Sequence, residues 1–278
     1  MTKRTDIGPY TFGQEVGKVT SEKLTEISGM APSGIYPETF WVNNDSGDDA
    51  KIYLINLEGE LIASLELPSA ENRDWEGVAT GDGYIFVGEI GDNRAIYPDK
   101  RIFRIPEPQG VDLSKRGQTL VAQRPEVMQF NFADAQRDSE SLAYDPLEKQ
   151  LLIISKREEQ VKVYTTPFVA TAPEEMLLLE SHTTLDMTQA TSADIALDGS
   201  KILVKTYMNI YFWKRAEGQS LIEALSTTPT VLNYEPEPQG EAIAWSTSED
   251  AFYTLSEKNG LAAPVIYKYL STASGGRR

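Results

Sequence analysis

Short apolar runs separated by turn residues recur along the chain, and they recur in a fixed order. Each unit opens with an acidic or hydroxyl residue, followed by a small or variable residue, an aliphatic residue and an alanine. The copies are residues 28–31, 76–79, 140–143 and 241–244, with a degenerate copy at 192–196. Successive copies begin from 48 residues (28 to 76) to 64 residues (76 to 140) apart, near the ~40–50 residues of one four-stranded propeller blade.

Two further runs follow each opening motif and predict the next strands of a blade. The second run is apolar throughout, at residues 40–42, 84–87, 151–154, 202–204 and 252–255. The third run alternates, as a half-exposed strand does, at residues 51–55, 101–105, 161–164, 210–213 and 265–269. Fourth strands are predicted at residues 61–67, 126–132, 175–181 and 230–234.

The last unit has no fourth strand of its own, whereas the N-terminal stretch 10–19 belongs to no unit. Pairing this stretch with the last unit would close the ring and remove an open sheet edge. The sequence therefore predicts an all-β fold, a five-bladed β-propeller of four-stranded antiparallel blades, in one domain spanning residues 1–278. Residues 218–225 are the one segment with a helix-compatible pattern.

Composition narrows the classes of function. The net charge of −16 repels phosphate, so we expect no binding to nucleic acid. The chain has no cysteine, which excludes disulfides, thiolate metal sites and cysteine nucleophiles. No apolar run approaches the ~18 residues of a membrane span, and no apolar signal segment follows the basic start. We expect a monomer, and an extracytoplasmic location after signal removal is slightly favoured over a cytoplasmic one.

The opening residues of the five units predict a metal site. In a propeller the first strand of each blade lines the central channel, so these residues would face one another around the axis. Several carboxylates so close together need a compensating charge, and a bound cation supplies it most simply. Oxygen ligands suit Ca²⁺, which accepts 6–8 of them. The predicted ligands are Ser28, Glu76, Glu140, Glu241 and, in the fourth unit, either Ser192 or Asp194.

The ends of the second strands lie on the same face as these residues and predict a ligand site. Lysine and arginine beside a cation are the usual equipment for binding a phosphate or carboxylate. The predicted ligand-binding residues are Asn44, Asn93, Lys156, Arg157 and Lys205. Asp45 and Asp92 are the candidate general bases. The alternative is that the basic residues form ordinary ion pairs with neighbouring acids.

The ring, together with the motifs 28–30, 75–79, 140–144 and 240–243, resembles the calcium-activated nucleotidase (apyrase) family. That resemblance implies a five-bladed propeller with Ca²⁺ in its channel and hydrolysis of nucleoside di- and triphosphates. The turns 44–47, 74–76 and 91–93 look more like poorly characterised bacterial propellers related to phytase-like and esterase-like propellers.

Two main hypotheses of function follow. The first is a calcium-dependent hydrolase of a phosphoanhydride or phosphoester, acting on a small anionic substrate. The second is a non-enzymatic propeller in which Ca²⁺ is structural and the face binds a ligand or a protein. A lactonase-type esterase is a weaker third, since propellers host all of these functions.

Overall fold

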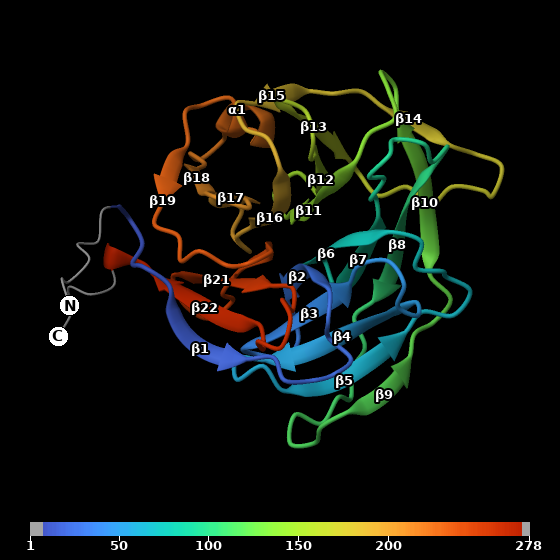
Figure 1. The fold of residues 1–278 in the computed structure, drawn as a ribbon. Helices are drawn as coiled ribbons and strands as arrows, with labels where there is room; N and C mark the ends of the chain where they lie inside the picture. Colours follow the sequence, from blue (N-terminus) through green and yellow to red (C-terminus); the bar gives the residue numbers. More distant parts are fainter. Residues whose placement is uncertain (1–7, 274–278) are drawn as a thin grey trace.

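The computed structural model describes residues 8–273, which form five β-sheets arranged around a central axis (Figure 1). Each sheet has four antiparallel strands that follow one another outward from the axis, and two of the sheets carry one additional parallel strand. The predicted all-β, five-bladed propeller is therefore confirmed. In the described part of the chain the one α-helix is α1 (Leu221–Leu225), which begins after a Ser220 capping box.

The first three blades include both of the five-stranded sheets. From the axis outward, blade one consists of β2 (Ile27–Pro32), β3 (Thr39–Asn44), β4 (Lys51–Asn56), β5 (Leu61–Glu66) and β9 (Gln118–Val121). Blade two consists, in the same direction, of β6 (Trp75–Gly81), β7 (Tyr84–Glu89), β8 (Lys100–Pro106), β10 (Glu126–Phe132) and β14 (Leu177–Leu179). Blade three consists of β11 (Ser139–Asp145), β12 (Gln150–Ser155), β13 (Val161–Thr166) and β15 (Thr183–Leu185).

The last two blades have four strands each. Blade four consists of β16 (Ala190–Ile195), β17 (Lys201–Thr206), β18 (Ile210–Lys214) and β19 (Thr230–Leu232). Blade five consists of β20 (Gly240–Trp245), β21 (Ala251–Ser256), β22 (Val265–Leu270) and β1 (Gln14–Lys18). None of the helices within residues 8–273 has the length and apolar character needed to cross a bilayer.

The N-terminal strand closes the ring, as predicted. Strand β1 pairs antiparallel with β22, and an isolated bridge joins Tyr10 to Ser271 (Figure 1). Blade five is thus assembled from both ends of the described chain. The edge that its third strand would otherwise leave open is covered.

The predicted fourth strand of blade three, at residues 175–181, is wrong. Its central part forms β14, which pairs in parallel with β10 of blade two, and Thr183–Leu185 closes blade three instead. The physical reason is packing, because Leu179 is buried in the apolar cluster that contains Phe130 and Phe132. Strand β9 likewise leaves blade two to extend blade one.

Apolar side chains fill the spaces between neighbouring blades. Between blades four and five, the ring of Tyr10 lies edge-on to Phe212 and Phe252, at 5.6 and 5.2 Å between centroids, and Trp245 lies 5.7 Å away. The Tyr10 hydroxyl donates to Asp250 at 2.9 Å. This one residue of the N-terminal segment therefore joins the closing strand to the core.

We expect Tyr10→Ala to lower the free energy of unfolding by about 3–5 kcal/mol, because it empties a buried aromatic site at the ring closure. Tyr10→Phe is the matched control and should cost about 1 kcal/mol, since it removes the hydrogen bond to Asp250 alone. Urea denaturation of the three proteins measures both values. Equal stability of Tyr10→Ala and the native chain would contradict this account of closure.

Candidate metal centre

A β-bulge at the start of each first strand sets the geometry of the axis. In all five blades the pairing with the second strand skips one residue at this point. A bulge leaves the extra residue unpaired and turns its side chain in a new direction. The five bulged residues are Ser28, Glu76, Glu140, Thr191 and Glu241.

The fourth bulge holds Thr191, whereas Ser192 and Asp194 were the predicted ligands. Thr191 is fully buried, and its hydroxyl donates to the carbonyl oxygen of Gly240 at 3.3 Å. Ser192 pairs with Lys205 in the regular ladder. The two carboxylate oxygens of Asp194 accept from the backbone amides of Trp245, at 2.7 Å, and Ile195, at 2.9 Å. Asp194 therefore fixes blade four to blade five, away from the three glutamates.

The three glutamates meet at the axis. Glu76, Glu140 and Glu241 are buried, and each offers a carboxylate oxygen within 4.8 Å of the others. Ser28 completes the contact, since its hydroxyl donates to Glu76 Oε2 at 2.6 Å. Glu140 Oε2 is buried and has no hydrogen-bond partner among residues 8–273. These oxygens form the kind of set that holds a hard cation.

Lys156 and Tyr207 bridge two of the glutamates. The Lys156 ammonium donates to Glu140 Oε1 and, at 3.0 Å, to the Tyr207 hydroxyl, which in turn donates to Glu241 Oε1. Burial alone would lower the pKa of Lys156, but the Glu140 carboxylate raises it above its ordinary value. Burial raises the pKa of Glu76 well above its ordinary value, and the charge of Glu140 raises it further. One ammonium thus faces three carboxylates.

A second set of five residues, which we call the second tier, lies at the same end of the channel as the bulged residues. It consists of the residue that follows the first pairing partner in each second strand, namely Asp45, Ile90, Lys156, Tyr207 and Glu257. A backbone hydrogen bond also recurs in three blades. In each, the amide of the tier residue donates to the carbonyl oxygen of a residue just before the first strand. These bonds are Asp45 to Glu26 (2.8 Å), Lys156 to Asp138 (3.0 Å) and Glu257 to Gln239 (3.0 Å).

Acidic groups also gather at the mouth of the channel, by which we mean the second tier together with Asp74. Asp45, Asp74 and Glu76 have carboxylate oxygens within 4.8 Å of one another, so Glu76 belongs to both groups. Burial, with the charge of Asp45, raises the pKa of Asp74 to about 7. Burial, with the charge of Glu241, raises the pKa of Glu257 to about 8. The mouth therefore holds groups that can exchange protons near neutral pH.

Three of the predicted ligand-binding or catalytic residues have structural contacts. Asp92 accepts from the Lys100 ammonium at 2.8 Å and from the amides of Ile96 and Tyr97, and Lys100 and Asp92 are both buried. The amide of Asn44 donates to Asp48 and to the Lys23 carbonyl, both at 2.7 Å.

Lys205 is fully buried and donates to the Tyr234 hydroxyl and the Gly240 carbonyl. Burial lowers the pKa of Lys205 to about 8. Lys205 and the Asp92 carboxylate are therefore both buried and hydrogen-bonded within the protein.

Arg157 and Asn93 do lie at the surface. The Arg157 guanidinium donates to Asn93 Oδ1 and, through Nε, to Asp138 at 2.5 Å, and its side chain is 44% exposed. Of the three predicted basic residues, Arg157 alone is accessible, because Lys156 is only 4% exposed.

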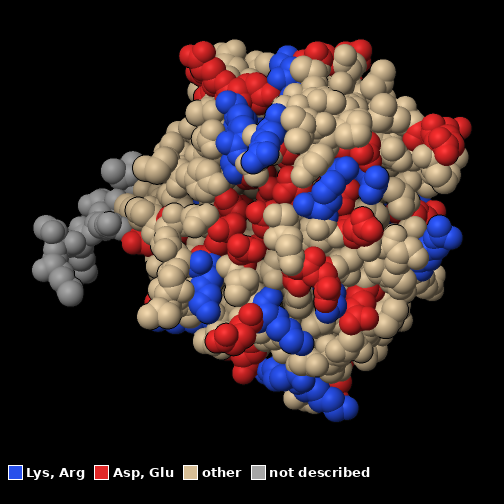
Figure 2. Space-filling model, turned by 45° about the vertical axis from the view of Figure 1, so that its right-hand side comes forward, with Lys and Arg blue, Asp and Glu red and all other residues tan. Residues whose placement is uncertain are grey.

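Three exposed apolar side chains lie in loops at the ends of the second strands. Ile96, Met208 and Leu261 are exposed by 59%, 77% and 103%, and each lies in a loop that joins the second and third strands of its blade. On the face shown in Figure 2, acidic side chains gather near the middle, with lysine and arginine side chains beside them.

Comparisons with known proteins assign the chain to no family. No family model matches the chain, and no curated protein matches it. Among solved structures, a chain of a nidogen/laminin complex is similar at 14% identity and a TM-score of 0.47, over 84% of this chain and 73% of the other. The β-propeller domain of Cps50 (Swd1) from Myceliophteria thermophila is similar at 10% identity and a TM-score of 0.47, over 92% and 99%. The nucleotidase resemblance therefore remains a hypothesis.

Asp194 generates a prediction about pH. Burial raises its pKa from 3.8 to about 7 in the folded protein. Between these values the folded state binds more protons than the unfolded state, so this carboxyl makes the protein less stable as pH rises. Asn offers one acceptor oxygen where Asp194 offers two, so the test is the change with pH. We expect the melting temperature of Asp194→Asn, relative to that of the native chain, to rise from pH 4 to pH 8, as followed by thermal denaturation. An equal difference at both pH values would contradict the assignment.

Proposed function

We propose that the channel holds one Ca²⁺ ion between Glu76, Glu140 and Glu241. The observation that carries this proposal is the meeting of three buried carboxylates, one of whose oxygens has no partner within residues 8–273. If all three are ionised, the Lys156 ammonium leaves two negative charges uncompensated at the axis, and a divalent cation offsets them. The oxygen-only ligand set favours Ca²⁺ over softer metals.

We further propose that the mouth binds and hydrolyses a small phosphate-bearing ligand, in the manner of the nucleotidases that the chain resembles. In this proposal Arg157 binds the anion, and Asp74 or Asp45 accepts a proton from water. The carboxylate of Asp74 lies within 4.8 Å of those of Asp45 and Glu76, and this position beside the proposed cation supports the role of general base. A bound Ca²⁺ would supply polarisation of the phosphate oxygens.

The alternative is a structural cation with no reaction at the mouth. The contacts of Asp92 and Lys205 favour this second function, because both side chains are buried and already hydrogen-bonded, which leaves fewer groups for a reaction. Both functions use the same Ca²⁺ site, but only the hydrolase would convert a substrate to product.

The metal proposal predicts stabilisation by Ca²⁺. A ligand that binds the folded state alone at 100 times its Kd stabilises by about 2.7 kcal/mol, so the melting temperature should rise with Ca²⁺ concentration. Glu76→Gln, Glu140→Gln and Glu241→Gln should each reduce this shift, whereas Glu58→Gln, at an exposed position, should not. Calorimetric titration would give the stoichiometry. An unchanged Ca²⁺ response in all three ring variants would contradict the site.

The hydrolase proposal predicts Ca²⁺-dependent release of phosphate from ADP or pyrophosphate. We expect Asp74→Asn to lower kcat by about a hundredfold or more, the usual loss when a general base is removed. Asp198→Asn, in an exposed turn, is the control. A melting temperature that rises with Ca²⁺ in a protein that turns over neither compound would favour the structural cation instead.

A further inference from the structure

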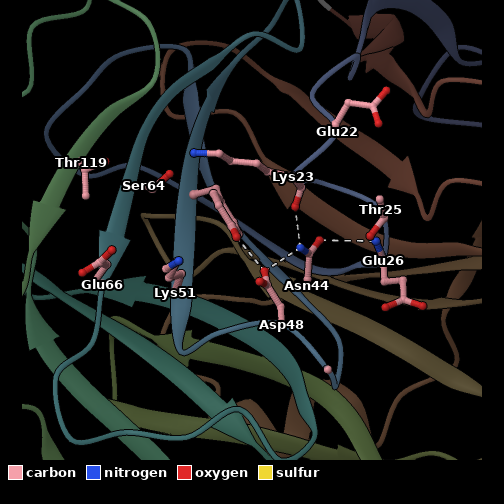
Figure 3. Close-up of a pocket in the computed structure, with 12 residues that line it drawn as sticks. Glu22, Lys23, Thr25, Glu26, Asn44, Asp48, Lys51, Ser64, Glu66 and Thr119 are labelled. Atoms are coloured by element: carbon pink, nitrogen blue, oxygen red, sulfur yellow. Dashed lines mark hydrogen bonds between the residues drawn. The ribbon is translucent and has the colours of Figure 1, made fainter.

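A second site candidate lies on blade one, outside the channel. A cavity of about 310 Å³ opens between strands β4, β5 and β9 on one side and residues 22–26 on the other (Figure 3). Asn44 lines this cavity, whereas the next residue, Asp45, belongs to the mouth. The volume is at the lower end of the range for small-molecule sites.

A row of hydroxyl groups crosses the strand wall of the cavity. Tyr53 of β4 pairs with Ser64 of β5, and Ser64 pairs with Thr119 of β9, so the three side chains lie on one face of the sheet. All three line the cavity. The row exists because β9 crosses over from blade two.

The hydroxyl in the middle of the row is unused. Tyr53 donates its hydroxyl proton to Asp48 Oδ2 at 2.6 Å, and this same oxygen accepts from Asn44 at 2.7 Å. Ser64 is only 4% exposed, yet its Oγ has no hydrogen-bond partner among the described residues. A buried hydroxyl without a partner costs free energy, and a ligand in the cavity would satisfy it.

Charged groups surround the hydroxyl row without forming a metal site. Lys51 and Glu66 are opposite each other in the strand register, two residues along from Tyr53 and Ser64. Glu22 and Glu26 lie on the opposite wall (Figure 3). Within residues 8–273, the groups of three acids close enough to share an ion all lie in the channel. The acids of this cavity are spread out, so they suit a molecule with several separated donors.

We propose that this cavity binds an amino sugar of monosaccharide size. Sugar hydroxyls both donate and accept, which matches a wall of hydroxyls, carboxylates and ammonium groups. Apart from Gly47, every residue that lines the cavity has a polar or charged side chain, so an apolar ligand finds little to contact. Four acids and two lysines line it, and this surplus of negative charge favours an amine on the sugar. The proposal is independent of the channel cation.

The test uses the full chain with glucosamine, glucose and putrescine, and calorimetric titration measures each affinity. We expect glucosamine to bind more tightly than glucose. Ser64→Ala and Thr119→Val should each weaken its binding about five- to tenfold, the loss of one hydrogen bond. Ser64→Ala removes a hydroxyl without a partner, so it should leave the melting temperature unchanged or higher. Thr230→Val, at an exposed position of β19, is the matched control.

Three results would overturn the proposal. The first is that neither sugar binds, and the second is that putrescine binds while both sugars fail, which would leave the hydroxyl row without a role. The third is that Glu241→Gln abolishes glucosamine binding while Ser64→Ala and Thr119→Val have no effect, which would place the amine in the channel. Loss of Ca²⁺ binding in Glu241→Gln with intact glucosamine binding would separate this proposal from that of the channel cation.

Discussion

The burial of like charges at the axis is the constraint on which the site depends. Five bulged strand starts bring their side chains to one point, and three of these are glutamates. Carboxylates that are desolvated and close together cannot all remain ionised without a partner. Lys156 and Tyr207 supply part of the compensation from the next tier. The remainder must come from protons or from a cation, and this choice decides what the mouth can do.

The propeller makes such a concentration of charge tolerable. Around the axis, each blade is held to its neighbours by apolar clusters that do not involve the ring. Apolar packing between the blades therefore offsets the free-energy cost of burying like charges at the axis. Because the ring residues are bulged out of the ladder, they can change protonation or ligation while the strand pairing around them stays intact.

Much of this arrangement follows from the sequence, because repeat position and apolar pattern are local signals. The spacing of the glutamates and the unassigned N-terminal stretch were sufficient to predict the five blades and their closure. The bulge is different, since it shifts the register by one residue without any change in composition. Residues 192–196 form a degenerate copy with one extra residue, and this copy begins at Ser192. Aligning Ser192 with Ser141 instead identifies Thr191 as the opening residue.

Contacts made across loops were also beyond a repeat-based prediction. Nothing in the pattern of blade two indicates that Lys100 is buried against Asp92, a predicted base that the structure shows in an ion pair. The exchange of β14 between blades depends on which apolar surface Leu179 fits best, and this is a tertiary property. Residues whose role depends on such packing can be recognised only once the blades are assembled.

The borrowed strands also bear on the order of synthesis. Blade one lacks its outermost strand until residue 121 has been made, and blade two lacks its own until residue 179. Strand β1 has no partner strand until residues 265–270 of β22 have been made. A chain that emerges from its N-terminus therefore carries incomplete sheets until residue 270 has been made. The ring around the axis cannot close before that point.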